Sequence, residues 1–441
     1  MAEIDSLGAL KQLMRQAQVN RLFVKILAAN DNSKNQIYLA GGFSVLNQLP
    51  TLPPEPQAGG NTLWARLNFS WLHDDGTASL ARGAKLILYP QYPEVRFSGF
   101  LQGCSQGPGD LLNPAQLGRT PGRVLLFGVT PDDRVFGYLA AANTKIAHEV
   151  IALRNVDDQI TLMQLPLIQE SDSRTRLLSE LLRIHRLDWI TSKGLRSDGS
   201  IQPCRSPNCV GYTLEAELGV ARNGRSEPDF LGWEIKASQV PDYLRPPTAK
   251  AQTLFTPEPN GGLYKTQGAE QFVRTYGYSD RSGREDRLNF GGVFRCGVRA
   301  ELTGLTLALD GYDAARERIA NPSGAIVLLD DQQNIAASWS FPALLSLWSR
   351  KHAKAAYVPA EKSASDWLYR YGPKVRLATG TDFLLLLQAI HAGIVYYDPG
   401  IKIEAASSSA PKLKRRSQFR IGARSLDALY HSFEQINLIE P

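Results

Sequence analysis

The chain has 441 residues, of which 43% are hydrophobic and 9% aromatic, and its formal net charge is +6. This length favours two domains over one, and the composition excludes an intrinsically disordered chain. No apolar run approaches the about 20 residues that span a bilayer, and residues 1–16 have the pattern of an amphipathic helix, not of a signal peptide. We therefore expect a cytoplasmic protein without a membrane partner, whose positive charge suits a polyanion.

The chain contains four cysteines, of which Cys204 and Cys209 form a C-x₄-C pair. Four cysteines are too few for a disulfide framework, and a pair without a second pair nearby does not predict structural zinc. Reduced thiols are the expectation for a cytoplasmic protein.

The first part of the chain, residues 1–168, is expected to be β-rich. Short apolar runs are separated there by Gly, Pro, Asn and Asp, which favours a closed or nearly closed barrel. These runs cover residues 21–27, 36–39, 62–71, 85–89, 96–101, 123–128, 134–141 and 159–163. Residues 169–172 end a polar stretch that we interpret as a linker, so residues 173–441 form the second domain. In that domain we expect helices at 174–190, 341–348, 364–371 and 381–392, and strands at 302–308 and 325–329.

Residues 211–238 (GYTLEAELGVARNGRSEPDFLGWEIKAS) carry the strongest chemical signal. A helix over 212–218 would present Glu215, and a strand over 230–237 would place Glu234 and Lys236 on one face. Asp229 would lie at the start of that strand. Three carboxylates converging beside one ammonium group are costly unless a divalent cation neutralises them, and Mg²⁺ prefers such oxygen ligands together with phosphate. This pattern predicts hydrolysis of phosphodiester bonds. Two alternatives stay open: a surface strand with a simple Glu–Lys pair, and Glu217 in place of Glu215.

The same run, from the helix to P-D-F-x-G-x-E-I-K, resembles the PD-(D/E)XK nucleases, and within them the MvaI/BcnI and MutH group. Residues 255–278 and 288–293 also resemble the MvaI-type enzymes. The resemblance implies an α/β PD-(D/E)XK fold for residues 173–441 and cleavage of double-stranded DNA. It further implies that Asp229 and Glu234 bind Mg²⁺, that Lys236 assists the attacking water, and that Glu215 supports the metal site.

In the first domain, residues 24–39 (VKILAANDNSKNQIYL) resemble the opening of the N-terminal effector-binding domain of EcoRII-type enzymes. That resemblance implies an all-β pseudobarrel, a fold shared with plant transcription factors, which grips DNA between two arms. The arms would be residues 30–36 and 90–99, although both could be ordinary polar hairpin loops. Side chains of these types can read base edges. The candidate contacts are Asn32, Lys34, Gln36, Tyr92, Glu94 and Arg96.

Residues 401–424 form the most basic segment, with seven Lys or Arg and one acidic residue. Strand alternation would place Arg416, Gln418 and Arg420 on one face, where they could read bases, while Phe419 and Ile421 pack inward. Lys412 and Lys414 would anchor the phosphate backbone. A solvated charge run is the alternative. The candidate DNA contacts are Lys412, Lys414, Arg415, Arg416, Gln418 and Arg420.

Together these patterns predict a monomeric, Mg²⁺-dependent type II restriction endonuclease that binds one copy of its DNA target in each domain. The resemblance, and not the chemistry of the residues, implies the target CCWGG and an effector role for the first domain. A MutH-like nicking enzyme and a catalytically inactive DNA-binding regulator are the alternatives. The intact Asp229, Glu234 and Lys236 argue against the regulator.

Overall fold

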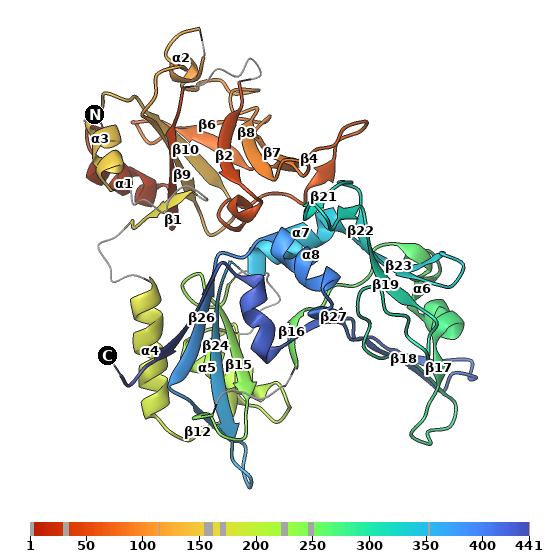
Figure 1. Ribbon diagram of the computed structural model, residues 1–441. Helices are drawn as coiled ribbons and strands as arrows, with labels where there is room; N and C mark the ends of the chain where they lie inside the picture. The colour runs from red at the N-terminus through yellow and green to blue at the C-terminus, as the bar shows by residue number, and fades with distance from the viewer. Residues whose placement is uncertain are drawn as a thin grey trace. The chain divides into compact units, whose positions relative to one another are not determined.

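The computed structural model describes residues 4–29, 35–113, 115–153, 162–167, 173–221, 228–245, 251–351 and 353–440. The chain divides into two compact units, Met1–Asp172 and Ser173–Pro441 (Figure 1). No helix among the described residues is both long and apolar enough to cross a membrane.

The first unit is built from two mainly antiparallel sheets and short helices. One sheet has the order β11-β1-β9-β10-β5-β6 and the other β2-β8-β7-β4-β3. The strands are β1 (Arg21–Leu27), β2 (Ile37–Gly41), β3 (Glu55–Pro56), β4 (Leu63–Arg66), β5 (Phe69–Leu72), β6 (Ala78–Leu80), β7 (Lys85–Tyr89), β8 (Glu94–Ser98), β9 (Arg123–Val129), β10 (Val135–Ala140) and β11 (Met163–Leu165). The helices are α1 (Leu7–Gln16), α2 (Gly109–Leu112) and α3 (Lys145–Ala152). The prediction of a β-rich first part is confirmed, although most of the run expected at 159–163 lies outside the described residues.

Aromatic side chains join the two sheets of this unit. Phe69 and Phe127 from one sheet pack edge-on against Phe97 from the other, with ring centroids 5.0 and 5.4 Å apart. Because all three rings are fully buried, this cluster forms the core between the sheets. On the outer face of the six-stranded sheet, α1 and α3 bury leucine and isoleucine side chains against β1 and β9.

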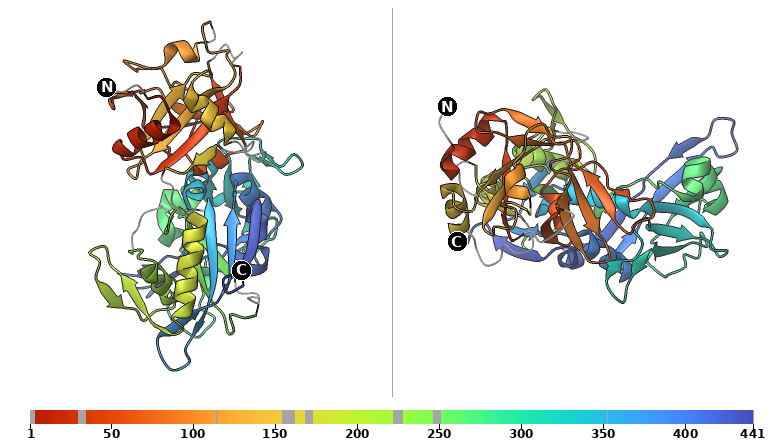
Figure 2. Two further views of the ribbon diagram at one scale, coloured as in Figure 1. Left: turned by 90° about the vertical axis from the view of Figure 1, so that its left-hand side faces the viewer. Right: turned by 90° about the horizontal axis from the view of Figure 1, so that it is seen from above.

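The second unit contains two lobes, which we call the first lobe and the second lobe. The first lobe is a sheet with the order β12-β25-β24-β26-β31, to which β15 adds in parallel alongside β24. Its strands are β12 (Ile190–Thr191), β15 (Glu234–Gln239), β24 (Lys354–Lys362), β25 (Leu368–Tyr371), β26 (Lys374–Thr379) and β31 (Ser432–Asn437). Helices α4 (Ser173–Arg186) and α5 (Cys209–Glu217) pack on the face that carries Ile235, Val358 and Leu377 (Figure 2). The hairpin β13 (Lys193–Leu195) and β14 (Ile201–Pro203) precedes α5.

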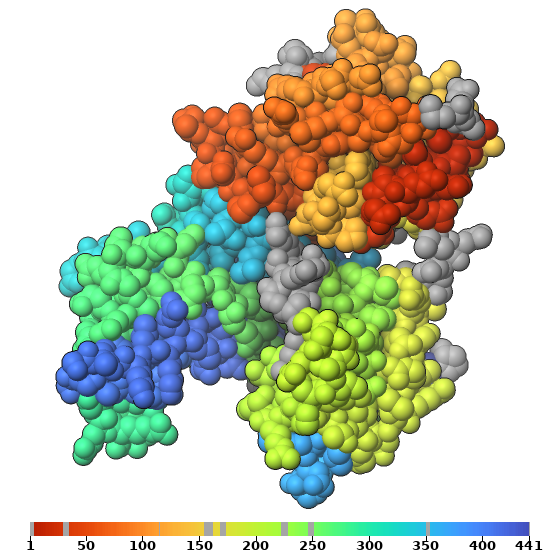
Figure 3. All heavy atoms as spheres, turned by 180° about the vertical axis from the view of Figure 1, so that it is seen from behind, coloured from red at the N-terminus to blue at the C-terminus, as the bar shows by residue number. Residues whose placement is uncertain are grey.

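The second lobe combines small sheets around α6 (Gly262–Tyr276). One is β16 (Ala251–Phe255), β30 (Phe419–Gly422) and β27 (Val395–Tyr397), and a second is β17 (Tyr278–Ser279), β18 (Arg287–Gly291), β28 (Gly400–Glu404) and β29 (Lys412–Lys414). The others are β19 (Thr306–Asp310), β22 (Ala325–Leu329) and β23 (Ile335–Ser340), and the pair β20 (Tyr312–Asp313) and β21 (Arg318–Ile319). Helices α7 (Phe341–Lys351) and α8 (Phe383–His391) and the 3-10 turn η2 (Ala423–Leu429) complete the unit. A broad hollow separates residues near 190–240 from residues near 255–300 and 400–420 (Figure 3).

One predicted helix in this unit is wrong. Residues 364–371 were expected to be helical, whereas Leu368–Tyr371 form strand β25. The burial of alternate residues, Tyr369 and Tyr371, gives this segment a period of two. Its pairing with residues 360–362 of β24 on one side and with β12 on the other then satisfies the backbone within the sheet.

Candidate active site and cationic surfaces

A tight turn brings Asp229 back onto the start of β15. Phe230 and Trp233 exchange two backbone hydrogen bonds of 3.0 and 2.8 Å, and the two residues between them have positive φ, 49° at Leu231 and 84° at Gly232. This is the geometry of a two-residue hairpin turn, in which glycine is favoured because it lacks a Cβ. As a result, Oδ2 of Asp229 accepts a hydrogen bond of 2.8 Å from the backbone N–H of Ile235. The strand begins at Glu234 instead of at residue 230, because the turn takes up the residues before it.

Glu234 and Lys236 contact each other on one face of β15. The Nζ of Lys236 lies 2.6 Å from Oε1 of Glu234, whose side chain is only 9% exposed. Trp233 and Ile235 point to the opposite face and join the core under α4 and α5. The expected alternation is therefore present, and it holds a carboxylate and an ammonium group together at the parallel junction of β15 and β24.

The two glutamates of α5 have different surroundings. Glu217 forms an ion pair with Nζ of Lys193 at 2.6 Å and lies 3.9 Å from Nη1 of Arg183. Glu215 lies back over the preceding turn, where its Oε1 would be 3.7 Å from a Cβ placed at Gly211. Glu217 is thus engaged by cations that belong to α4 and β13.

The expected convergence of three carboxylates does not occur. Among the residues that the structure describes, no group of three or more His, Cys, Asp or Glu side chains is close enough to hold a metal ion. Instead, Asp229 accepts a backbone hydrogen bond and Glu234 pairs with Lys236. Asp229 and Glu234 still offer two neighbouring carboxylates, and Mg²⁺ is commonly bound by one or two carboxylates together with water and phosphate. Their chemistry therefore fits Mg²⁺.

Two buried tyrosines support the sheet beside Glu234. The hydroxyl groups of Tyr357 on β24 and Tyr430 lie 3.0 Å apart. Burial raises the pKa of Tyr357 to about 12, and the negative charge of Glu234 also acts to raise it. Both tyrosines therefore remain protonated at neutral pH, so they act as uncharged hydrogen-bonding groups near the site.

The expectation of reduced thiols is wrong for Cys204 and Cys209, which form a disulfide in the structure. The chain folds so that Cys209 begins α5 and its Cα lies 5.7 Å from that of Cys204, a separation that a disulfide can bridge. Cys104 and Cys296 are free thiols. The disulfide therefore ties the loop after β14 to the helix that carries Glu215.

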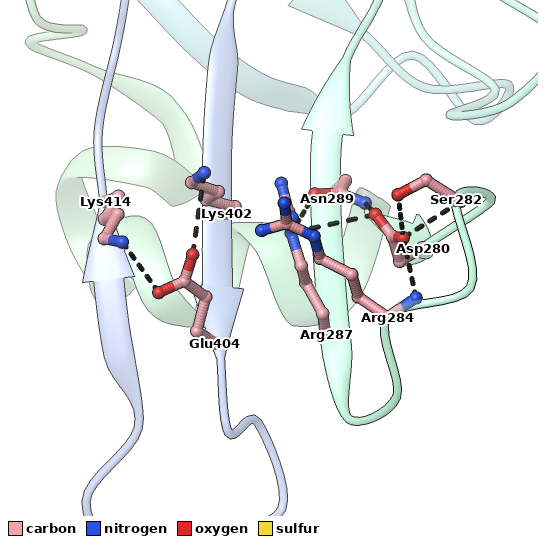
Figure 4. A network of polar contacts seen from close by, with 8 residues as sticks. All are labelled: Asp280, Ser282, Arg284, Arg287, Asn289, Lys402, Glu404 and Lys414. Atoms are coloured by element: carbon pink, nitrogen blue, oxygen red, sulfur yellow. Dashed lines mark hydrogen bonds and ion pairs between the residues drawn. The ribbon is translucent and has the colours of Figure 1, made fainter.

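The four-stranded sheet β17-β18-β28-β29 presents a polar face with an excess of positive charge (Figure 4). Glu404 lies between Lys402 and Lys414, at 3.5 and 2.7 Å. Asp280 accepts hydrogen bonds from the side chains of Ser282 and Asn289, which hold its pKa well below the usual range. The other face buries Phe290 and Ile403.

The register of this sheet places the charged residues in adjacent rows. The polar face carries Arg287, Asn289, Lys402, Glu404, Lys412 and Lys414. Lys412 and Lys414, predicted from the basic segment, are exposed. Sequence analysis missed Arg287 and did not single out Lys402, because they join this surface only through strand pairing between distant segments.

The expected common face of Arg416, Gln418 and Arg420 is not present. Strand β29 ends at Lys414 and β30 begins at Phe419, so the three residues do not belong to one strand. Arg416 is exposed, whereas Gln418 is 7% exposed and its Oε1 accepts a hydrogen bond from Thr253.

The neighbours of these residues have distinct surroundings. Arg420 pairs with Asp398 at 2.6 Å. Arg415 is exposed, and its positive charge acts on the hydroxyl of Tyr264, which donates to Glu258. The predicted packing of Phe419 and Ile421 is confirmed, since both are fully buried.

In the first unit, parts of the two expected arms meet. Nη1 of Arg96 lies 3.4 Å from Oε1 of Gln36, and Nη2 of Arg96 lies 2.6 Å from Oε1 of Glu94. The guanidinium also lies over the ring of Tyr89 at 4.9 Å. Tyr92 is 69% exposed. Asn32 and Lys34 lie outside the described residues.

A cavity of about 410 Å³ lies beside this group, lined in part by Lys25, Gln36, Arg96 and Arg123. Arg123 is only 2% exposed and donates to the carbonyl oxygens of Thr120 and Ala28, at 2.7 and 3.1 Å. Nζ of Lys25 donates to the carbonyl of Leu39 at 2.6 Å. Sequence analysis missed Lys25 and Arg123, because only the packing of β1 against β2 and β9 brings them to this cavity.

Comparison with protein families matches residues 178–430, more than half of the chain, to the MvaI/BcnI restriction endonuclease family. Among solved structures, the restriction endonuclease MvaI in complex with its cognate DNA substrate is 19% identical, with a TM-score of 0.44. That alignment covers 60% of this chain and 99% of the other. MvaI in the absence of DNA is 20% identical, with a TM-score of 0.33, over 61% of this chain and 99% of the other. No curated protein matches the chain.

Proposed function

The chain belongs to the MvaI/BcnI restriction endonuclease family, and from this we propose that it is a type II enzyme that cuts both strands of duplex DNA at a short specific sequence. The observation that carries the proposal is the grouping of Asp229, Glu234 and Lys236 at one end of β15. A carboxylate pair beside an ammonium group can bind a divalent cation and stabilise charge on a phosphate, which suits phosphodiester hydrolysis.

In this proposal Asp229 and Glu234 hold Mg²⁺. The cation would supply charge stabilisation for the phosphate that is attacked. Lys236, which contacts Glu234, would orient the attacking water and neutralise charge that develops on the phosphate oxygens. Glu215 acts from α5 as a supporting residue. Glu217 is less suited, because Lys193 already neutralises it.

The DNA duplex would occupy the hollow between the two lobes (Figure 3). Lys412 and Lys414 on β29 are exposed and suit contacts with the phosphate backbone. Arg415 and Arg416 are also exposed beside this strand and could reach the duplex. Gln418 and Arg420 would read bases only after exchanging their bonds to Thr253 and Asp398.

For the first unit we propose an EcoRII-N-like pseudobarrel that binds a second copy of the target as an effector. Support comes from its two sheets joined by an aromatic core, and from the meeting of Gln36, Glu94 and Arg96 beside a cationic cavity. Asn32, Lys34 and Tyr92 belong to the same proposed surface. The proposed target of both units is CCWGG, and the proposed active species is a monomer.

A digest of plasmid DNA tests the central proposal. With Mg²⁺ the enzyme is expected to give discrete fragments whose ends map to one short sequence, and without a divalent cation it should give none. Nicked circles alone would indicate a MutH-like enzyme, and uncut plasmid would indicate a DNA-binding regulator. Asp229→Asn is the matched control, since an asparagine oxygen can still accept the hydrogen bond from Ile235 while the charge is removed.

A further inference from the structure

A row of side chains crosses the sheet of the first lobe on the face that carries Lys236. Lys236 pairs in register with Tyr357, Tyr357 with Arg376, and Arg376 with Gln435. Side chains at paired positions point to the same side of a sheet, and neighbouring strands lie about 4.8 Å apart. Arg376 therefore occupies the same face as Lys236, two strands and about 10 Å away.

Beside this row the sheet is hollowed into a pocket of about 60 Å³. Its polar lining includes Ser238, Tyr243, Arg245, Lys374, Arg376 and Gln435. A site of this size has room for about four water molecules, which is enough for the oxygens of one phosphate group. The lining offers three cations, three hydroxyls including that of Tyr357, and one amide, and contains no carboxylate.

The cations of this pocket are only weakly neutralised. Arg376 lies over the rings of Tyr357 and Phe433 at 5.8 and 5.6 Å, and Nη1 donates to the carbonyl of Ala423 at 2.9 Å. In the part of the chain that the structure describes, neither Arg376 nor Lys374 forms an ion pair, whereas Arg245 pairs with Asp242 at 3.2 Å.

Burial lowers the pKa of Arg376, which expresses the cost of keeping its charge out of water. The negative charge of Asp427 offsets part of this cost, and because arginine keeps its proton in proteins, a bound anion would offset more of it. The aromatic rings and the Ala423 carbonyl fix the guanidinium in place before any ligand arrives.

We infer that this pocket binds a backbone phosphate of the DNA strand being cut, close to the scissile phosphate, with Arg376 and Lys374 as the binding residues. The inference rests on the proposed function, because it takes Lys236 to mark the scissile phosphate. Successive phosphates of one strand advance about 3.4 Å along the helix axis, so a site about 10 Å from Lys236 corresponds to a phosphate within about three nucleotides. Holding that phosphate would position the scissile bond against Glu234 and Lys236.

Binding of phosphate-modified duplexes tests the inference. Cognate duplexes with one neutral methylphosphonate at each position near the cut are titrated, with Ca²⁺ in place of Mg²⁺, against the full chain and its Arg376→Gln and Lys374→Ala variants. The wild-type protein is expected to lose about 10- to 100-fold in affinity at one particular position. Each variant should bind the unmodified duplex more weakly than the wild type does. A methylphosphonate at that position should then cause little further loss of affinity in the variant. The salt dependence of binding should also fall by about one unit of slope per charge removed.

The controls separate the possible outcomes. Lys362→Ala removes a lysine that stacks on Trp367 at 3.8 Å and lies outside the pocket, so it should respond to every duplex as the wild type does. If Arg376→Gln fails to fold, Lys374→Ala, at an exposed residue, carries the test. Inorganic phosphate at millimolar concentration should weaken DNA binding by the wild-type protein more than DNA binding by the variants. If methylphosphonates lower the affinity of the wild type and of the variants equally at every position, the inference is overturned. Plasmid cleavage by the wild type would still support the proposed function in that case. A wild type that cuts no plasmid would overturn the proposed function itself.

Discussion

The ion pair between Nζ of Lys193 and Oε1 of Glu217, at 2.6 Å, gives the two glutamates of α5 different roles. Glu217 fastens α5 to β13, and Thr213 adds to this contact by accepting a hydrogen bond from the backbone N–H of Lys193. Glu215, two residues earlier, is not part of this ion pair. Glu217 is therefore a structural carboxylate of the helix, and Glu215 remains the residue that we propose as the support of the active site.

We expect Glu215→Gln and Glu217→Gln to separate activity from stability. Glu215→Gln should lower the cleavage rate by about 10- to 100-fold, as expected for loss of a residue that supports a metal site without binding the metal. Glu217→Gln should leave the rate nearly unchanged and reduce the free energy of unfolding by about 1–2 kcal/mol, because it leaves Lys193 without its partner. Single-turnover cleavage and urea denaturation measure the two effects. The reverse pattern would make Glu217 the active-site residue.

Asp229→Ala should abolish cleavage and leave specific DNA binding in Ca²⁺ largely intact. The carboxylate stabilises charge mainly in the transition state, so its loss affects the rate more than the affinity. The alanine variant also removes the acceptor for the N–H of Ile235, which Asp229→Asn retains. Comparing the melting temperatures of both variants separates this structural loss from the catalytic one. Full cleavage by either variant would refute the site.

The basic surface of β28 and β29 should contain phosphate anchors and a base reader. Lys412→Ala and Lys414→Ala should weaken cognate and random DNA equally and reduce the salt slope by about one each. Arg416→Ala should cost about 1–3 kcal/mol at the cognate site and little on random DNA. Gln418→Ala and Arg420→Ala should in addition lower stability, since both side chains are bonded within the fold. Fluorescence anisotropy at several salt concentrations distinguishes these cases, and unchanged cognate binding in all five variants would leave this segment a solvated surface.

The disulfide between Cys204 and Cys209 should contribute measurable stability. The cross-link lowers the conformational entropy of the unfolded chain. In the chain-entropy model, closing so short a loop raises the free energy of unfolding by about 2 kcal/mol. A reducing agent should therefore lower the melting temperature of the wild type, whereas Cys204→Ser should melt at the lower temperature and respond to no reductant. An equal effect of the reductant on both proteins would show that the cross-link does not stabilise the fold.

Local sequence patterns were sufficient to predict which side chains share a face within one element. The common face of Glu234 and Lys236 follows directly from strand alternation, whereas Asp229 precedes a turn and reaches the start of the strand only by folding back onto Ile235. The pattern did not predict the turn at Leu231 and Gly232, because positive φ at leucine is uncommon. The helix expected at 364–371 was wrong for a related reason, since pairing with β24 overrides local preference.

Features that depend on distant segments could not be predicted in this way. Arg376 joins the row of Lys236 only through the register of β15, β24 and β26. Of these strands, β15 lies more than a hundred residues before the other two in the sequence. The choice between Glu215 and Glu217 depends on Lys193, and the separation of Gln418 from Arg416 depends on Thr253. Each of these contacts is a tertiary pairing, which carries no periodic signal in the sequence.

The DNA-binding role that we propose for the first unit raises the question of what it would add to the proposed active site of the second unit. Asp229, Glu234 and Lys236 all lie in the second unit, so the first unit is not needed to build the site. Two weak sites joined in one chain raise each other's effective concentration on the same DNA molecule. Alternatively, occupation of the first unit by a second target copy could favour the active state of the nuclease, which is an effector mechanism.

The two mechanisms give different results for the full-length enzyme. An effector mechanism requires that plasmids with two targets are cut faster than plasmids with one. It also requires that added cognate duplex raises the cleavage rate of the one-target plasmid. A plain tether predicts that added duplex only competes. We expect the effector result, and we expect Arg96→Ala to lose the stimulation while it keeps the one-target rate, because Arg96 connects Gln36 to Glu94 on the proposed DNA-contact surface. Lys85→Ala is a suitable control, since its ammonium group stacks on Trp64 at 4.1 Å on the same sheet without contacting these residues. Equal rates on one-target and two-target plasmids, unaffected by duplex, would exclude the effector role.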